Sequence, residues 1–393
     1  MEHFRRLEKE LFPSKYATIT SRGRQTPQGP DKFRTDFQRD VHRIIYSQSF
    51  RRLRHKTQVF YFPQNDHIST RMDHVRFVAS AARTVARCLG LNEDLAEAIG
   101  LAHDIGHAPF GHQGEEFLTD IFNKHPVLKE LMPKFSHEIY GLRVVDRIAK
   151  RDRERPGLNL MWEVRDGIIS HCGEDFTTCK LEPANKEKNL DIIKTCEDAG
   201  NPATPEGCIV RLIDKIAYVG KDIEDAIEVG VIKEPDIPEK FRIVLGTTNG
   251  QIIGRFIEDM VKESYDKDYI AISHGLGDLL HELINFNDER IYHSDQAEMY
   301  KTQAKKTIEY LFYDLLSELK QRNGFQNYDY PPADDTSIPQ VYRTFRDFVA
   351  RDMKGVYKPD DPNELIVLDF IAGMTDSFAI RSVSDVFIPK MTV

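Results

Sequence analysis

The sequence predicts an all-α protein, built as a helical bundle with additional helices toward the C-terminal end. Over most of the chain, apolar residues recur at three- and four-residue steps, which is the spacing of one face of an α-helix. Helix boundaries carry typical residues, as where Gly90 closes one periodic stretch and Asn92 opens the next. Sustained β alternation is scarce, and the short extended piece expected at 57–63 ends in a proline.

We expect an irregular N-terminal arm over residues 1–35, followed by one large helical domain over 36–393. The helical core of this domain is expected over 36–230, and further helices over 231–393. Residues 173–206 are polar and contain three prolines, which predicts an exposed insertion or a flexible loop. Helical periodicity is expected over residues 37–50, 70–90, 92–103, 114–124, 136–150, 160–171, 206–229, 239–321 and 340–379.

The composition is that of an ordinary soluble globular protein. Of the 393 residues, 40% are hydrophobic and 30% are charged. The net charge of −9 argues against a general nucleic-acid binder, and the basic cluster at 51–56 is expected to be a solvated face. No apolar run reaches the roughly 18 residues of a membrane span, and residues 1–16 lack the apolar core of a signal peptide. We therefore expect a cytoplasmic protein without membrane partners.

The five cysteines indicate neither a disulfide framework nor a zinc ribbon. Their number is odd, and no C-x-x-C pair occurs. Four of them, Cys172, Cys179, Cys196 and Cys208, lie close together in the sequence. Reduced structural thiols are the expectation, and a soft-metal cluster is the alternative.

One short stretch, HDIGHAPFGHQGE at residues 103–115, carries most of the candidate chemistry. It places three histidines and two carboxylates among three glycines and a proline, between two helical segments. Imidazoles are costly to bury without partners, so such a concentration predicts a metal site with acid–base groups beside it. The alternative interpretation is a polar surface turn between helices.

Four residues are the candidate metal ligands: His74, the doublet His103 and Asp104, and the distant Asp214. The doublet cannot point one way within a regular helix, but at a helix end before Gly106 both side chains can converge on one ion. Two imidazoles with two carboxylates suit a divalent ion such as Mn, Fe, Mg, Co, Ni or Zn. The alternatives are a core histidine at 74 and a buried salt-bridge partner at 214.

These residues reproduce the H…HD…D pattern of the HD-domain metal-dependent phosphohydrolases. Four longer blocks narrow the resemblance: FQRDVHRIIYSQSFRRLRHKTQVF, HDIGHAPFGHQGE, RLIDKIAYVGKDIED and DFIAGMTDSFA. Together they resemble the dGTPase (deoxynucleoside triphosphate triphosphohydrolase) family, from about residue 34 to 380. The resemblance implies an HD-domain helical bundle and a hydrolase of nucleotide metabolism that releases deoxynucleoside and inorganic triphosphate.

The resemblance also implies roles for individual residues. His74, His103, Asp104 and Asp214 would hold one divalent metal per subunit, with Mn or Mg favoured, while water attacks the α-phosphorus of the dNTP. His112, paired with Glu115, would protonate the leaving 5′ oxygen. Residues that would line the phosphates or contact the nucleotide are His107, His137, Arg71 and Lys215. Residues that would contact the sugar are Gln58, Tyr218, Asp222 and Tyr292, although core packing is an equal alternative for both tyrosines.

The expected partners are a dNTP substrate, a dNTP activator and further copies of the chain in a homo-oligomer (tetramer or hexamer); nucleic acid is not expected. The sequence leaves two alternative functions open. The first keeps the metal site and changes the substrate, giving a nucleotidase or phosphodiesterase that acts on monophosphates or cyclic nucleotides. The second is a protein that senses dNTPs without turnover, for which a degraded metal set is expected. The complete ligand set argues against the second rival.

Overall fold

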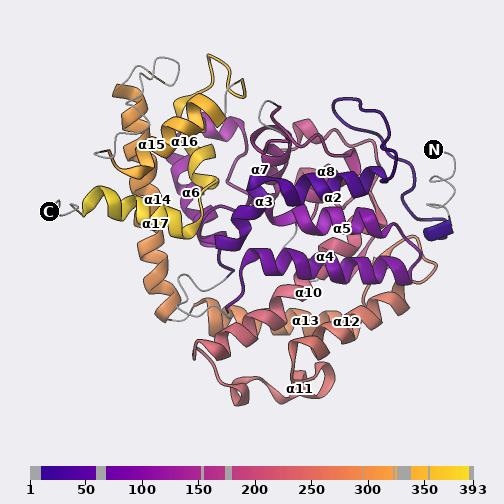
Figure 1. Ribbon diagram of the computed structural model, residues 1–393. Coiled ribbons are helices and arrows are strands. Elements are labelled where there is room, and N and C mark those ends of the chain that lie inside the picture. Colours follow the sequence, from indigo (N-terminus) through magenta and orange to yellow (C-terminus); the bar gives the residue numbers. More distant parts are fainter. Residues whose placement is uncertain are drawn as a thin grey trace.

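The described part of the chain is mainly helical, which confirms the all-α prediction (Figure 1). This computed structural model describes residues 10–58, 68–151, 155–172, 179–293, 295–321, 324, 338–352 and 355–388. The α-helices are α2 (Asp36–Tyr46), α3 (Gln48–Arg52), α4 (Arg71–Cys88), α5 (Glu93–Ala102), α6 (Gly111–Lys124), α7 (His137–Arg143), α8 (Trp162–Ile169), α9 (Cys196–Ala199), α10 (Pro205–Glu228), α11 (Glu239–Leu245), α12 (Asn249–Ser264), α13 (His274–Asn287), α14 (Asp295–Gln321), α15 (Gln340–Asp347), α16 (Asn363–Ala372) and α17 (Asp376–Phe387).

Short 3-10 and π-helical turns connect or extend these helices. The 3-10 turns are η1 (Leu53–His55), η2 (His103–Gly106), η3 (Pro126–Glu130), η5 (Leu190–Ile192) and η6 (Glu234–Asp236). The π-helical turns are η4 (Val144–Ile148), η7 (Asp288–Tyr292) and η9 (Phe348–Asp352). The expected helix 136–150 is therefore divided into two shorter pieces, and residues 239–321 form several helices with short breaks, as expected.

Helices α4, α5 and α10 form the centre of the bundle. Helix α4 packs against both α5 and α10, and α2 covers another side of α5 (Figure 1). Helix α4 begins with a capping box. The Thr70 hydroxyl oxygen accepts from the Asp73 amide, and the Asp73 carboxylate accepts from the Thr70 amide. This cap fixes the first turn of α4, and that turn carries Arg71 and His74.

The C-terminal helices gather on one side of the molecule, beside α6. Helix α14 packs against α6, α16 and α17, and Figure 1 shows this group on the left of the view. Its apolar residues Ile308, Leu311, Phe312 and Leu315 are fully buried. The last helices of the chain therefore lie next to the segment that follows the HD doublet.

The segment 179–204 has many exposed residues, as its polarity predicts, but it also has fixed contacts with the core. Leu181, Leu190 and Ala199 are buried against the main core, and a disulfide joins Cys172 to Cys196. That disulfide corrects the expectation of reduced thiols for these two residues. A few apolar side chains anchor the segment, and they are too widely spaced to show periodicity. Residues 173–178 lie outside the described part of the chain.

A two-stranded antiparallel sheet was not predicted. Strand β1 (Lys180–Leu181) pairs with β2 (Ile270–Ala271), with Lys180 opposite Ala271. Two-residue strands are too short to show alternation in a sequence. Most of the extended piece expected at 57–63 lies outside the described residues, although Thr57 forms an isolated antiparallel bridge with Thr70.

The basic cluster 51–56 is a solvated face only in part. Arg54 and His55 are exposed as expected, but Lys56 is 3% exposed. The Lys56 ammonium donates to the backbone carbonyls of His107 and Ala372. Its burial corrects the solvated interpretation at this position. Among the described helices, none is long and apolar enough to span a bilayer.

Buried carboxylates hold the N-terminal arm against the bundle. Glu206, at the start of α10, is fully buried and accepts from the amide and hydroxyl of Thr18 and from the amide of Asn92. Glu163 on α8 accepts in the same way from the Ser21 hydroxyl and the Arg22 amide. The arm over residues 10–35 is irregular, as predicted, but it has fixed contacts.

Replacing Glu206 by alanine is expected to destabilise the fold through this contact. The substitution leaves three donors, two on Thr18 and one on Asn92, without their acceptor. A buried unsatisfied group costs about 1–3 kcal/mol, so we expect the free energy of unfolding to fall by at least that amount in urea titrations. Glu263→Ala, an exposed position on α12, is the control and should stay within about 0.5 kcal/mol of wild type. Equal losses in the two variants would contradict this account of the arm.

Candidate active site

The HD doublet lies where α5 gives way to η2. Helix α5 ends at Ala102, and the tighter turn η2 follows at once, so the two adjacent side chains can point toward one region. The distance from His103 Nε2 to Asp104 Oδ1 is 3.5 Å, so the two side chains lie close together. A Cβ on Gly106 would lie 2.0 Å from the carbonyl oxygen of His137, so only glycine permits this close packing of η2 against α7.

His74 and Asp214 complete the cluster from two other helices. His74 Nε2 lies 2.8 Å from Asp214 Oδ1, and His103 Nε2 lies 3.3 Å from the same oxygen. Asp104 is the most distant member, with its Oδ2 at 4.0 Å from His74 Nε2. The first turn of α4, the middle of α10 and the end of α5 therefore bring together all four predicted ligands.

The chemistry of this cluster fits a divalent cation. His103 Nδ1 donates to the Gly100 carbonyl at 2.8 Å, which leaves Nε2 facing the carboxylates as a ligand atom. That Nε2 atom is buried between the carboxylates of Asp104 and Asp214, at 3.5 and 3.3 Å. Burial lowers the pKa of His103, but the charges of Asp104 and Asp214 outweigh it and raise this pKa to about 9. Ligand atoms of His74, His103 and Asp214 all lie within 4.8 Å of one another.

Three more imidazoles form a wall beside the cluster. The rings of His107 and His137 stack at 3.6 Å, and His112 stands edge-on to both. Nitrogen atoms of the three residues lie within 4.8 Å of one another, and His112 is the exposed member. His107 Nδ1 lies 3.2 Å from Asp104 Oδ1, so the wall is in contact with the carboxylate cluster. Such a wall can donate to, or be neutralised by, an anionic group.

The predicted pairing of Glu115 with His112 is not the one observed. Glu115 Oε1 lies 3.0 Å from His137 Nδ1 and 3.5 Å from His107 Nε2. Glu115 is buried and reaches across to the start of α7, whereas His112 faces the pocket. Burial lowers the pKa of His137, but Glu115 and Glu138 raise it to about 10. Glu115 therefore keeps His137 charged and in place.

His171 is a site residue that the sequence interpretation missed. Its Nδ1 donates to the Ile168 carbonyl at 2.6 Å, and its Nε2 lies 3.2 Å from His137 Nε2. Its ring also packs edge-on to His103, at 5.1 Å between centroids. The available signal was a histidine at the end of an apolar helix, which is the same placement that His103 has after α5.

A second group of predicted residues lines the same pocket. Asp222, two turns after Asp214 on α10, accepts from the Tyr292 hydroxyl at 2.5 Å. Burial raises the pKa of Asp222 to about 7. Asp222 Oδ1 and Gln58 Oε1 are both buried without a hydrogen-bond partner in the described part of the chain. Two unsatisfied acceptors that line one pocket are suited to a hydroxyl-bearing ligand.

Arg71 also lines this pocket. Its guanidinium is 1% exposed, and Nη1 lies 2.9 Å from Asp104 Oδ2. The pocket measures about 540 Å³, and its lining includes the predicted residues Gln58, Arg71, His74, Asp104, His107, His112, His137, Asp214, Lys215, Tyr218, Asp222 and Tyr292. His103 and Glu115 stand behind this lining. The structure thus brings every predicted site residue to one place.

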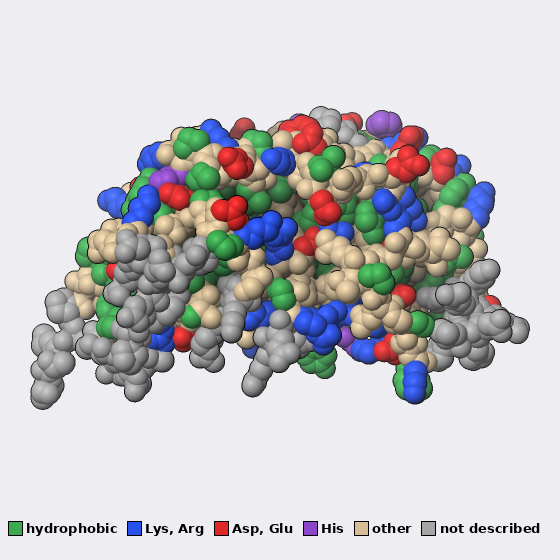
Figure 2. All heavy atoms as spheres, turned by 90° about the horizontal axis from the view of Figure 1, so that it is seen from above, with side chains coloured by type: hydrophobic (Ala, Val, Ile, Leu, Met, Phe, Trp, Pro, Cys, Tyr) green, Lys and Arg blue, Asp and Glu red, His purple; other side chains and the backbone are tan. Residues whose placement is uncertain are grey.

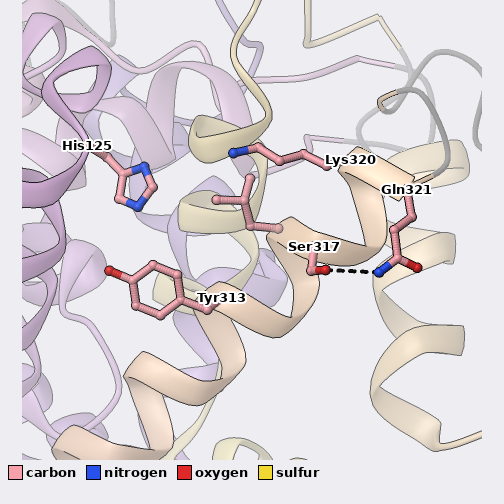
Figure 3. Close-up of a pocket in the computed structure, with 6 residues that line it drawn as sticks. His125, Tyr313, Ser317, Lys320 and Gln321 are labelled. Carbon is pink, nitrogen blue, oxygen red and sulfur yellow. Dashed lines mark hydrogen bonds between the residues drawn. The ribbon is translucent and has the colours of Figure 1, made fainter.

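A separate surface hollow on α14 has no part in this cluster. It measures about 450 Å³ and is lined by His125, Tyr313, Leu316, Ser317, Lys320 and Gln321. In Figure 3 the His125 and Tyr313 rings approach each other, and Gln321 donates to Ser317 at 3.1 Å. It shares no lining residue with the histidine-rich pocket. Figure 2 shows acidic and basic side chains interspersed over one face of the molecule, without a broad area of one sign.

Comparison with known proteins agrees with this geometry. The family model of the HD domain matches residues 71–219. A protein of Caldanaerobacter subterraneus subsp. tengcongensis is 36% identical over 382 residues, covering 97% of this chain and 94% of the relative. One from Desulfatibacillum aliphaticivorans is 36% identical over 387 residues, covering 98% and 96%, and one from Clostridium tetani is 32% identical over 389 residues, covering 98% and 94%. All three are named deoxyguanosinetriphosphate triphosphohydrolase-like proteins.

The chain belongs to the deoxyguanosinetriphosphate triphosphohydrolase-like family. The resemblance seen in the sequence motifs is thereby confirmed. HD domains are metal-dependent, and all four candidate ligands of this chain fall within the matched range. The matched range ends before Asp222 and Tyr292, so the HD domain contains the four candidate ligands but not the whole pocket.

Proposed function

We propose that this protein hydrolyses deoxynucleoside triphosphates, dGTP or several dNTPs, to deoxynucleoside and inorganic triphosphate. The observation that carries the proposal is a single pocket lined both by the carboxylate–imidazole cluster and by two unsatisfied hydroxyl acceptors, on Gln58 and Asp222. The HD domain and the names of the relatives support the coarser assignment, a hydrolase of phosphoric esters. A dNTP whose sugar contacts Gln58 and Asp222 would place its α-phosphate near the cluster.

His74, His103, Asp104 and Asp214 would hold one divalent cation, with Mn or Mg favoured. When bound, such an ion supplies Lewis-acid polarisation of a phosphate oxygen and lowers the pKa of an attacking water. The protein's own carboxylates fix the geometry around it. Asp214 is held by His74 and His103, and Arg71 holds Asp104.

The histidine wall and two cations would bind and balance the triphosphate. His107 and His137 face the pocket as a stacked pair, and Glu115 holds His137 in its charged form. Lys215 lines the same pocket, as does Arg71, whose Nη2 atom has no hydrogen-bond partner among the described residues. His112, the most exposed of the three imidazoles, would donate a proton to the departing 5′ oxygen.

Gln58, Asp222 and Tyr292 would select the sugar. Gln58 Oε1 and Asp222 Oδ1 can accept from a 3′ hydroxyl, since both are buried and unsatisfied. Tyr292 donates its own hydroxyl to Asp222, which fixes its ring beside the acceptors, and Tyr218 lines the same region. A ring held in this way would exclude a 2′ hydroxyl by occupying the space next to C2′.

Removing the Tyr292 ring is expected to relax the choice between deoxyribonucleotides and ribonucleotides. A pocket that rejects one added hydroxyl by shape discriminates by about 10²-fold, so Tyr292→Ala should lower the ratio of kcat/KM for dGTP over GTP by at least about tenfold. Tyr292→Phe is the control, because it keeps the ring and loses only the hydrogen bond to Asp222. We expect it to leave the ratio of kcat/KM for dGTP over GTP unchanged and to raise KM. An unchanged ratio in Tyr292→Ala would show that another residue selects the sugar.

The proposed reaction is tested by its products. Purified protein is incubated with each dNTP and NTP, singly and mixed, and separately with each dNMP, with Mg or Mn, and the products are separated by chromatography. Inorganic triphosphate and deoxynucleoside are expected. If only orthophosphate from monophosphates is formed, the site belongs to a nucleotidase, and the proposal fails. A homo-oligomer, a dNTP activator and a cytoplasmic location stay predictions from the resemblance and the composition.

A further inference from the structure

The turn that carries His107 and His112 has an unusual backbone. Between η2 and α6, Phe110 has φ 66° and ψ 21°, a left-handed conformation that side chains with a Cβ rarely adopt. Phe110 is also fully buried, and no side chain caps α6 at this residue. Such a conformation persists only where the surroundings determine it. The question is therefore which contacts hold this turn.

Asp376, the first residue of α17, makes the main polar contact. Its Oδ1 accepts from the Phe110 amide at 3.0 Å. Its Oδ2 accepts from both the amide and the hydroxyl of Thr57, at 2.9 and 2.7 Å. The carboxylate is 1% exposed, so these three bonds form away from solvent. One side chain therefore joins the turn, the segment next to Gln58 and the C-terminal helices.

Lys56 reinforces the same junction. Its ammonium donates to the carbonyl of His107, at the start of the turn, and to that of Ala372, at the end of α16. The Lys56 carbonyl accepts from the Arg71 amide at 3.0 Å, which ties the segment to the first turn of α4. The turn is thus held at both ends, at His107 by Lys56 and at Phe110 by Asp376. Both of these residues lie outside the range matched by the HD family model.

We propose that Asp376 is a positioning residue for the catalytic turn, which sets the direction of His112 relative to Gln58 by holding Phe110 and Thr57 together. The proposal rests on the proposed function for its catalytic consequence. Asp376 does not line the pocket and lies outside the HD match, so it acts only through the residues it holds. It gives the C-terminal block DFIAGMTDSFA, which ends in α17, a role in the site.

The test uses the full chain and the variant Asp376→Asn. An amide offers one acceptor oxygen in place of two, so it cannot satisfy both Phe110 and Thr57. Misplacement of a catalytic group by about 1 Å costs on the order of 10²-fold in rate, so we expect kcat for dGTP to fall about 10- to 100-fold. KM and metal content should stay near wild type, because the metal ligands and Arg71 lie outside the turn. Amide hydrogen exchange over residues 105–115 should become faster.

Thr57 provides the second variant and its conservative rescue. Thr57→Val removes the hydroxyl donor to Asp376 and should lower kcat in the same direction, whereas Thr57→Ser keeps the hydroxyl and should restore it. Glu364→Gln, on α16 with partners Lys320 and His125, is the control and should change neither kcat nor exchange. Wild-type kcat in both Asp376→Asn and Thr57→Val would overturn the proposal. If wild type forms no triphosphate, the proposed function fails, and exchange over 105–115 alone decides whether Asp376 holds the turn.

Discussion

Asp214→Asn is expected to remove the metal and nearly all hydrolysis. The amide carries no charge, so the cluster loses one of its two carboxylates, and the ion pairs of this residue with His74 and His103 are lost. Metal-assisted polarisation contributes several kcal/mol, so we expect activity to fall by more than about 10³-fold. Elemental analysis of the purified variant should find almost no bound divalent metal, against about one per chain in wild type.

A matched control exists on the same helix. Asp225 also lies on α10 and is also buried, but it pairs with Lys221 and with the Ser69 amide. Asp225→Asn should keep both metal and turnover, with loss of stability as its main effect. Full metal content in Asp214→Asn would contradict the ligand assignment, and equal loss of metal in both variants would show that helix α10 had unfolded.

The second large effect is expected at His112. His112→Ala should lower kcat by about 10²–10⁴-fold, the usual contribution of a general acid, while metal content stays at the wild-type level. The reason is geometric, because His112 lies on the wall with His107 and His137 and not in the carboxylate cluster. Single-turnover rates and elemental analysis on the same preparation separate the two effects.

His125 supplies the control for His112. It follows the same helix, α6, but packs against Phe312 and Tyr313 at the separate hollow (Figure 3). His125→Ala should therefore leave kcat unchanged. If His112→Ala loses its metal, then His112 is a ligand, and the division of roles between cluster and wall is wrong.

The sequence predicted most of the helices because their apolar faces and caps are local signals. Helix α4, expected over 70–90, runs from Arg71 to Cys88, with Gly90 at φ 66° where a closing glycine was expected. The residues of the carboxylate–imidazole cluster also carry a signal in the sequence, since His103-Asp104 is a doublet and Asp214 interrupts an apolar helix face. The structure shows both placed around one point.

Other features depend on contacts between distant segments. The partner of Glu115 is His137 because α7 begins beside α6, and no spacing within α6 indicates this. The same holds for three other features: the disulfide between Cys172 and Cys196, the burial of Lys56 and the contact of His171 with His137. Each depends on contacts between segments distant in the sequence, which leave no local pattern. Pairwise spacing in the sequence therefore predicts site membership better than it predicts partners within the site.

The fate of the attacking oxygen tests the proposed reaction most directly. Hydrolysis of dGTP in water enriched in oxygen-18 is followed by mass spectrometry of both products. Attack at the α-phosphorus breaks the bond to the 5′ oxygen, so one labelled oxygen should appear in inorganic triphosphate and none in deoxyguanosine. Label in orthophosphate or pyrophosphate, with dGDP or dGMP as the other product, would contradict the account.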